Sequence, residues 1–272
     1  MKSHGFLHRS LYALAGLIAV GICAAAVALL WMDRRASWTQ AYVSASNLTE
    51  VLAADIGRTI HVYDLSLQGV IERLQEPGIR DLPRATLHRF LFDRSASAEF
   101  LGTILILDSE GNVVYDSQTI EPPKANFADR DFFQVHRDSA DAGMYVSRPY
   151  RSRLRDGDES IGISRRLSNL DGSFAGVVTG SLRLAFFRER FARLSLGPQD
   201  SITILRNDGA VIARSPYSST DLGADIGQAK AFQQFLIRRD GAFVGALAPD
   251  GVERLYTCLL YTSDAADDTP CV

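Results

Sequence analysis

Residues 103–117 read TILILDSEGNVVYDS, and residues 201–216 read SITILRNDGAVIARSP. Each stretch consists of an apolar, β-branched run, a short polar turn and a second apolar run, which is the pattern of a β-hairpin. Because the second stretch is a smaller copy of the first, the chain repeats one supersecondary unit. The repeat predicts an α+β fold with two consecutive antiparallel-sheet units.

Further elements complete the first unit around its hairpin. The segment MYVSRPY (Met144–Tyr150) predicts a third strand. Two more runs, SIGISRRL (Ser160–Leu167) and FAGVVTGSLRL (Phe174–Leu184), predict a second hairpin across the turn NLDGS. Short helices are expected at Ala85–Ser95 and Ala185–Leu194. The first unit is therefore predicted to hold a full sheet with helices at its ends.

The second unit is predicted to be incomplete. It holds a helix near Lys230–Arg238 and strands at Ala242–Leu247 and Arg254–Tyr256, and it lacks a final strand. A sheet that stopped there would leave an unpaired edge. From Cys258 the alternation ends, and CLLYTSDAAD is encoded by tgt ctc tta tac aca tct gac gct gcc gac, which resembles the transposase adapter of short-read libraries. We expect residues 258–272 to be translated adapter, with a genuine disordered tail as the alternative.

The N-terminal region carries an apolar segment of membrane-spanning length. Residues 11–32, LYALAGLIAVGICAAAVALLWM, contain no charge. At about 1.5 Å per residue such a helix crosses a hydrocarbon core of about 30 Å. We expect an uncleaved transmembrane helix, with residues 1–10 in the cytoplasm. The alternative is a cleaved signal peptide, whose apolar region usually runs about 7–15 residues.

Residues 33–77 carry the pattern of one long helix. Apolar side chains recur in steps of mostly three or four from Trp38 to Leu74, which places them on one face. Pro77 and Gly78 end the pattern. This stalk helix is predicted to leave the membrane and pack on a sheet, and other parts of it can form a dimer seam.

Composition excludes several classes of function. The chain has 46% hydrophobic and 22% charged residues and a net charge of −3, so no nucleic-acid surface is indicated. No nucleophile-elbow, zinc-protease, P-loop or dinucleotide motif occurs, so no catalytic residue and no cofactor are predicted. No metal site is predicted either, because the histidines lack metal-binding spacing and the cysteines avoid the body of the chain: His4, His8, His61, His88, His136, Cys23, Cys258 and Cys271.

Four segments in order resemble a known family. LILDSEGNVVYDS, DRDFFQVHRD, GISRRLSNLDGSFAGVVTGSLRL and ITILRNDGAVIARSP resemble the double Cache (dCache, or PDC) sensor region of bacterial membrane receptors, over roughly residues 36–257. The resemblance implies PAS-like units, a membrane-distal one at residues 78–194 and an incomplete membrane-proximal one at residues 195–257. It also implies an inner-membrane anchor and a sensor region in the periplasm.

The resemblance looks closest to sensors that precede diguanylate cyclases. It implies a missing second membrane helix and a missing GGDEF domain that makes c-di-GMP; a histidine kinase or a chemoreceptor is the alternative output. The chain as given lacks a GGDEF or kinase motif, so it is predicted not to be an enzyme. Two further hypotheses stay open, a partner-binding scaffold and a membrane-tethered hydrolase with a serine beside His136.

The family implies a ligand site in the first unit. Receptors of this kind that bind amino acids use an Arg-x-Trp-Tyr element and a later Asp. Here Arg130 keeps the arginine, Phe132 and Phe133 replace the aromatic pair, and Ser181 replaces the aspartate. An ammonium group needs acceptors to be desolvated cheaply, whereas arginine pairs with carboxylates. The ligand expected is therefore a small anionic metabolite such as an organic acid.

Further candidate site residues follow from strand parity and proximity. Thr179 and Ser181 share one face of their predicted strand. The remaining candidates lie on neighbouring elements: His136, Tyr145, Arg148, Tyr150 and Arg166. Structural roles stay open for several of these residues. Arg130 can pair with Asp108 or Asp116 instead, and both phenylalanines can be core residues.

Overall fold

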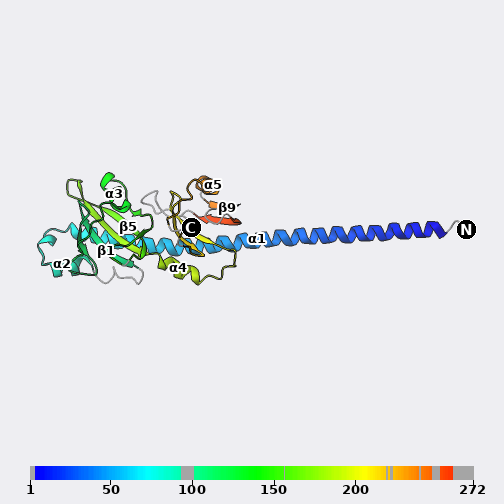
Figure 1. Ribbon diagram of the computed structural model, residues 1–272, viewed down its shortest axis with the longest axis horizontal. Coiled ribbons are helices and arrows are strands. Elements are labelled where there is room, and N and C mark those ends of the chain that lie inside the picture. Colours follow the sequence, from blue (N-terminus) through cyan, green and yellow to red (C-terminus); the bar gives the residue numbers. More distant parts are fainter. Residues whose placement is uncertain are drawn as a thin grey trace. The chain divides into compact units, whose positions relative to one another are not determined.

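The computed structural model describes residues 4–92, 101–155, 157–218, 220, 223–238, 240–246 and 252–259. The chain divides into two units, Met1–Leu48 and Thr49–Val272. The predicted membrane helix and stalk helix form one continuous helix, α1 (His4–Leu74) (Figure 1). It stops three residues before the predicted end, and Gly78 adopts a left-handed φ of 74°. Within the described residues, the segment from Gly16 contains a window of mean hydropathy 2.1, with none of that window buried.

The first sheet unit contains six antiparallel strands. They are β1 (Leu101–Asp108), β2 (Val113–Asp116), β3 (Tyr145–Val146), β4 (Tyr150–Arg151), β5 (Glu159–Ser168) and β6 (Phe174–Arg183). Their order is β2-β1-β6-β5-β3, and β4 also pairs with β5. The single third strand predicted at residues 144–150 is therefore wrong in detail. It is two short strands, because Pro149 lies between them and has no N–H for the ladder.

Short helices flank this sheet. They are a 3₁₀ helix (Ile79–Asp81), α2 (Arg84–Leu91), α3 (Asp131–Asp138) and α4 (Ala185–Ala192). The helix expected at residues 85–95 ends at Leu91, and the rest of that range from residue 93 lies outside the described residues. Arg130 is the N-cap residue that precedes helix α3; its backbone is extended, and its carbonyl accepts from the N–H groups of Phe133 and Gln134, both at 3.0 Å.

Alternating side chains give the first sheet two buried faces. One face joins β1, β5 and β6 residues such as Ile104, Ile163 and Val178 to Ile60 and Tyr63 of α1 in a single apolar cluster. Each fully buried side chain of this size contributes about 1.5–3 kcal/mol. This confirms the prediction that the stalk helix packs on a sheet.

Tyr63 marks the closest approach of α1 to the sheet. Its hydroxyl donates to the carbonyls of Ser181 (2.9 Å) and Gly102 (3.3 Å). A Cβ at Gly180 would lie 2.2 Å from the Tyr63 ring, so only glycine fits there. A second tie is the ion pair between Arg165 and Asp64, which are also joined by an Nη2–Oδ2 bond of 2.8 Å. The helix is thus held by shape and by charge.

The second sheet unit is smaller. It contains β7 (Ile202–Leu205), β8 (Val211–Ser215), α5 (Lys230–Arg238), β9 (Asp240–Ala246) and β10 (Glu253–Leu259). The described residues form two separate two-stranded sheets, β7-β8 and β9-β10. Strand β10 continues to Leu259, past the boundary expected at Thr257, and Thr257 hydrogen-bonds Thr49 of α1 (Oγ1–Oγ1 2.9 Å). The rest of the predicted adapter segment lies outside the described residues.

The internal repeat predicted from the two hairpins is visible in their geometry. Both hairpins carry a register shift at the same place, after Ile106 and after Ile204. Both turns contain a left-handed glycine, Gly111 (φ 86°) and Gly209 (φ 87°). Each turn also makes one isolated antiparallel bridge to the chain that follows it, to Asn126 and to Asp225.

Candidate functional site

The face of the first sheet turned away from α1 carries buried hydroxyl groups. Thr103 shares this face with Leu105 on β1, and Thr179 shares it with Val177 on β6. The register pairs Ser164 with Thr179, and Gly162 with Ser181. We call these hydroxyl-bearing side chains the hydroxyl face: Thr103, Ser160, Ser164, Thr179 and Ser181. Four of them are buried, and Ser181 is half-buried. The shared face of Thr179 and Ser181 is as predicted.

Two arginines beside this face lack a carboxylate partner within the described residues. Arg130 donates through Nη2 to the Arg151 carbonyl (3.2 Å), and its guanidinium lies 4.9 Å from the centre of the Tyr150 ring. Its Nε is buried without a partner among the described groups. Arg155 donates through Nη2 to the Thr103 hydroxyl at 2.6 Å. Neither guanidinium forms a direct ion pair among the described residues, and weaker charge interactions reach Asp129 from Arg130 and Asp116 from Arg155.

The structural alternative for Arg130 is not observed. Among the described residues no ion pair joins it to Asp108 or Asp116. Asp108 accepts from its own turn, at Glu110 N and Asn112 N (both 2.9 Å). Asp116 accepts from Gln118 N (2.8 Å).

Electrostatic effects place both arginine charges near one phenol. Burial raises the pKa of Tyr150 to about 12; the charge of Asp131 also raises it, while the charges of Arg130 and Arg155 act in the opposite direction. Burial also raises the pKa of Asp116, again opposed by Arg155. Sequence reasoning missed Arg155, because it lies in the loop between β4 and β5, where no periodicity assigns a side chain to a face.

His136 lies on the buried side of α3, against the hydroxyl face. Its Nε2 is 2.9 Å from Ser164 Oγ, and both residues are 0% exposed. The pKa of His136 is lowered to about 4, mainly by burial and in smaller part by the nearby charges of Arg166 and Arg165. Its Nδ1 has no partner among the described groups. This serine–histidine pair therefore does not support the hydrolase hypothesis, because the base is weak, inaccessible and not oriented by a third group.

The two phenylalanines lie in an apolar cluster. Phe132 packs against Tyr150 (ring centroids 5.7 Å apart) and Phe127 (6.2 Å), and Phe133 packs against Phe174 (5.5 Å). They are 2% and 1% exposed. Both are therefore core residues, and only Phe132 reaches the Tyr150 ring next to Arg130.

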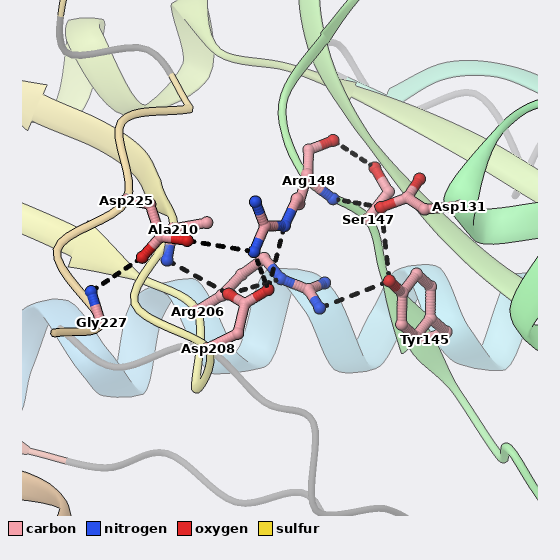
Figure 2. A network of polar contacts seen from close by, with 9 residues as sticks. All are labelled: Asp131, Tyr145, Ser147, Arg148, Arg206, Asp208, Ala210, Asp225 and Gly227. Atoms are coloured by element: carbon pink, nitrogen blue, oxygen red, sulfur yellow. Dashed lines mark hydrogen bonds and ion pairs between the residues drawn. The ribbon is translucent and has the colours of Figure 1, made fainter.

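Three further candidates are engaged by other protein groups. The Tyr145 hydroxyl donates to Asp131 Oδ2 (3.3 Å). Arg166 donates to the His136 carbonyl and to the Gly172 carbonyl. Arg148 pairs with Asp208 and Asp225 of the second sheet unit, not with the hydroxyl face (Figure 2). In the described residues no group of three or more His, Cys, Asp or Glu side chains is placed to hold a metal ion.

The site combines three kinds of group. Arg130 and Arg155 supply positive charge outside any direct ion pair, Tyr150 and Phe132 supply aromatic surface, and the hydroxyl face supplies polar groups, of which Ser164 and Thr179 already bond His136 and the Ile163 carbonyl. Such a combination suits a small anion, since guanidinium groups pair with carboxylates and hydroxyl groups complete the hydrogen bonding.

Comparison with known proteins identifies the fold. A family model described as "dCache_1_like: Histidine kinase sensor domain" matches residues 185–271. No curated protein matches the chain. Among solved structures, the extracellular domain of the putative histidine kinase rpHK1S-Z16 is 25% identical, with a TM-score of 0.67, over 86% of this chain and 94% of that one.

Two chemoreceptor structures share the fold at lower identity. The periplasmic sensory domain of Campylobacter jejuni Tlp1 is 12% identical, with a TM-score of 0.62, over 86% of this chain and 93% of that one. The ligand-binding domain of the Pseudomonas aeruginosa PAO1 amino acid chemoreceptor PctB, in complex with L-Arg, is 14% identical, with a TM-score of 0.59, over 83% of this chain and 90% of that one.

These matches agree with the fold expected from the sequence. They are sensor and ligand-binding domains and not enzymes, which agrees with the prediction that this chain is not an enzyme. They include no diguanylate cyclase sensor, so the expected closeness to cyclases is not shown. The chain thus shares its fold with histidine kinase and chemoreceptor sensor domains, and its residues 185–271 match a dCache-like sensor family model.

Proposed function

We propose that this chain is the ligand-sensing input region of a membrane-bound signalling receptor. Residues 11–32 span the inner membrane, and residues 33–77 form the stalk. Residues 78–194 form the membrane-distal sensor unit in the periplasm, and residues 195–257 form the membrane-proximal unit. The apolar window of α1 and the dCache-like fold support this assignment.

The ligand is a small organic anion. The observation that carries this assignment is the pair of guanidinium groups beside the hydroxyl face, Arg130 and Arg155, which form no direct ion pair with a described carboxylate. The amino acid chemoreceptor PctB was solved with L-Arg. In this chain Ser181 stands where the family has an aspartate, so an α-ammonium group would lack its usual counter-charge. A carboxylate without an amine fits this site better.

The output domain is proposed to be a histidine kinase, with a chemoreceptor or a diguanylate cyclase as alternatives. The family model and the solved structure with the highest identity among those described above both come from histidine kinase sensors, which supports the kinase. The cyclase rests on sequence resemblance alone. Resequencing the locus beyond the Thr257 codon tests this, because a kinase, receptor or GGDEF coding region would follow in frame.

The receptor is proposed to form a homodimer through its stalk. On the part of α1 that belongs to the second compact unit, Val51, Val62 and Leu65 are 67%, 47% and 52% exposed. Spacings of eleven and three residues place them on one side of a helix with 3.6 residues per turn. These exposed apolar side chains, with Arg58 lying between Val51 and Val62 on the same side, are proposed to be buried against a second copy of the same helix.

Thermal shift tests the ligand class on the full chain in detergent. The probes are acetate, lactate, succinate and citrate, with L-alanine as the amine-bearing comparison. We expect an organic anion to raise Tm, and Arg130→Gln to weaken its binding by about tenfold or more, since bonds to charged groups contribute about 1.5–3 kcal/mol. Arg153→Gln is the matched control, because Arg153 pairs with Asp129 on the outside of the same unit (2.6 Å).

Two outcomes would contradict the assignment. One is a panel in which no organic anion raises Tm, which would favour the partner-binding scaffold. The other is a shift that persists in both Arg130→Gln and Arg155→Gln.

A further inference from the structure

Arg148 joins the two sheet units. Its Nε donates to Asp208 Oδ2 (3.0 Å), and its Nη2 lies 2.9 Å from the same oxygen and 3.4 Å from Asp225 Oδ2. Both aspartates belong to the second sheet unit. The backbone N–H of Arg148 donates to Asp131 Oδ2 of α3 at 2.7 Å. Figure 2 shows the residue held between the aspartates on one side and Asp131 on the other.

A second connection runs parallel to the first. Arg206, in the turn between β7 and β8, donates through Nε to Asp208 Oδ1 (3.2 Å) and through Nη2 to the Tyr145 hydroxyl (3.4 Å). That hydroxyl donates to Asp131 Oδ2, the oxygen that also holds Arg148. Arg206 is 8% exposed and lies over the Tyr145 ring, 5.0 Å from its centre. One carboxylate oxygen of α3 is therefore linked to the second unit by two routes.

The polar contacts just described form a network, and along the chain its residues lie next to residues of the anion site. Arg130 belongs to the site, and the next residue, Asp131, belongs to the network. Arg148 belongs to the network, and Tyr150, two residues later, lies under the Arg130 guanidinium. A displacement of either segment by a bound anion moves a network residue as well, because the backbone between them is one or two residues long.

The second hairpin presents its carboxylates in a prepared geometry. Asp208 Oδ1 accepts from Ala210 N (3.1 Å), and Asp225 Oδ1 accepts from Gly227 N (2.8 Å), which leaves both Oδ2 atoms for Arg148. In the first copy of the repeat, Asn126 makes the equivalent bond to Ala128 N (2.9 Å), with an amide in place of the carboxylate. At the position of Asn126 the second copy thus has the negatively charged Asp225, which contacts Arg148.

We propose that Asp131, Arg148, Asp208 and Asp225 form a clasp that transmits a displacement at the start of α3 to the second sheet unit. The anion as the cause of that displacement rests on the proposed function; the clasp itself does not. Arg148 is 47% exposed, so its ion pairs are weak and screened by salt, and the clasp opens readily. The closed state has Arg148 on the two aspartates, and the open state lacks those contacts.

Hydrogen exchange on the full chain in detergent tests the clasp without a ligand. In Arg148→Gln we expect the amides of residues 206–211 to exchange at least about threefold faster than in the unmodified chain. Asp131→Ala is expected to raise exchange there too, because Asp131 Oδ2 holds both the Arg148 backbone and the Tyr145 hydroxyl that Arg206 bonds. The matched controls, Arg153→Gln and Asp129→Ala, remove an ion pair at the start of α3 that stays within the first unit and should leave residues 206–211 unchanged.

Salt gives a second readout that needs no change in α3. Raising NaCl from about 0.1 to 1 M shortens the screening length from about 10 to 3 Å. Exchange at residues 206–211 should rise more in the unmodified chain than in Arg148→Gln, which keeps only the Arg206–Asp208 ion pair in this turn.

The clasp is overturned by any of three results. The first is amide exchange at residues 206–211 that does not change in Arg148→Gln. The second is an Asp131→Ala effect on exchange that is confined to α3. The third is that the control variants raise exchange at residues 206–211 by the same amount. The thermal-shift panel separates this proposal from the ligand assignment. If no compound of the panel shifts Tm but amide exchange changes as expected, the anion ligand is contradicted and the clasp is still supported.

Discussion

The buried imidazole of His136 makes the stability of this protein depend on pH. His136 is 0% exposed, and its pKa is lowered from 6.5 to about 4, mainly by burial. Between these values the unfolded chain binds a proton that the folded chain does not. The contribution of His136 to the free energy of unfolding therefore rises with pH. It is fully present above about pH 6.5 and is lost as the pH falls toward 4.

The magnitude follows from the same two values. At about 1.36 kcal/mol per pH unit, a fall from 6.5 to about 4 corresponds to about 3 kcal/mol, of which about 2 kcal/mol is already lost at pH 5. This is a large share of the 5–15 kcal/mol typical of a folded domain. His136→Gln removes the titrating group and keeps a polar atom for the Ser164 hydroxyl, so its stability should lack this component.

Urea unfolding followed by near-UV circular dichroism measures the effect. The full chain and His136→Gln are compared in detergent at pH 7.5, 6, 5 and 4.5. Both proteins contain the same carboxylates, so the effect of carboxylate titration cancels in the difference between their free energies of unfolding. We expect the unmodified chain to lose about 2 kcal/mol relative to the variant between pH 7.5 and 5. A difference that stays constant with pH would refute the assignment of a buried, neutral imidazole.

Two further predictions concern α1. Gly180→Ala should lower the free energy of unfolding by about 1–3 kcal/mol, because the new methyl would lie 2.2 Å from the Tyr63 ring. Gly69→Ala has open space and should raise helix stability by about 1 kcal/mol, so equal Tm changes in the two variants would contradict the close approach. Leu65→Glu should shift sedimentation in detergent from dimer to monomer, because it places a charge on the exposed apolar side of α1. A dimer that persists in Leu65→Glu would argue against the stalk seam.

Local pattern was sufficient for most elements of the fold. Alternation and turn residues predicted the β5–β6 hairpin to within a residue or two of its ends. The repeat predicted two hairpins, and the structure shows that both have a register shift and a left-handed glycine. The prediction of one strand at residues 144–150 was wrong, because it followed the strand-like pattern and did not allow for the break at Pro149.

The candidate site was predicted less completely. Arg130 was found through its resemblance to a family element, and Thr179 and Ser181 through strand parity. Arg155 was missed because a loop has no period from which to infer a face. Arg148 was assigned to the ligand, yet its charge meets Asp208, sixty residues later in the chain.

The order of the residues was enough to establish that this chain has a long apolar helix, two hairpin-based sheet units and a sensor-like pattern. These properties depend on neighbours within a few positions, where periodicity and turn chemistry act. Which charges are paired depended on the folded arrangement. Arg148 is neutralised by Asp208 and Asp225 across the two units, while Arg130 and Arg155 lie beside the hydroxyl face without a described carboxylate. Coulomb interactions follow distance in space, and only folding brings distant parts of the chain within a few ångströms.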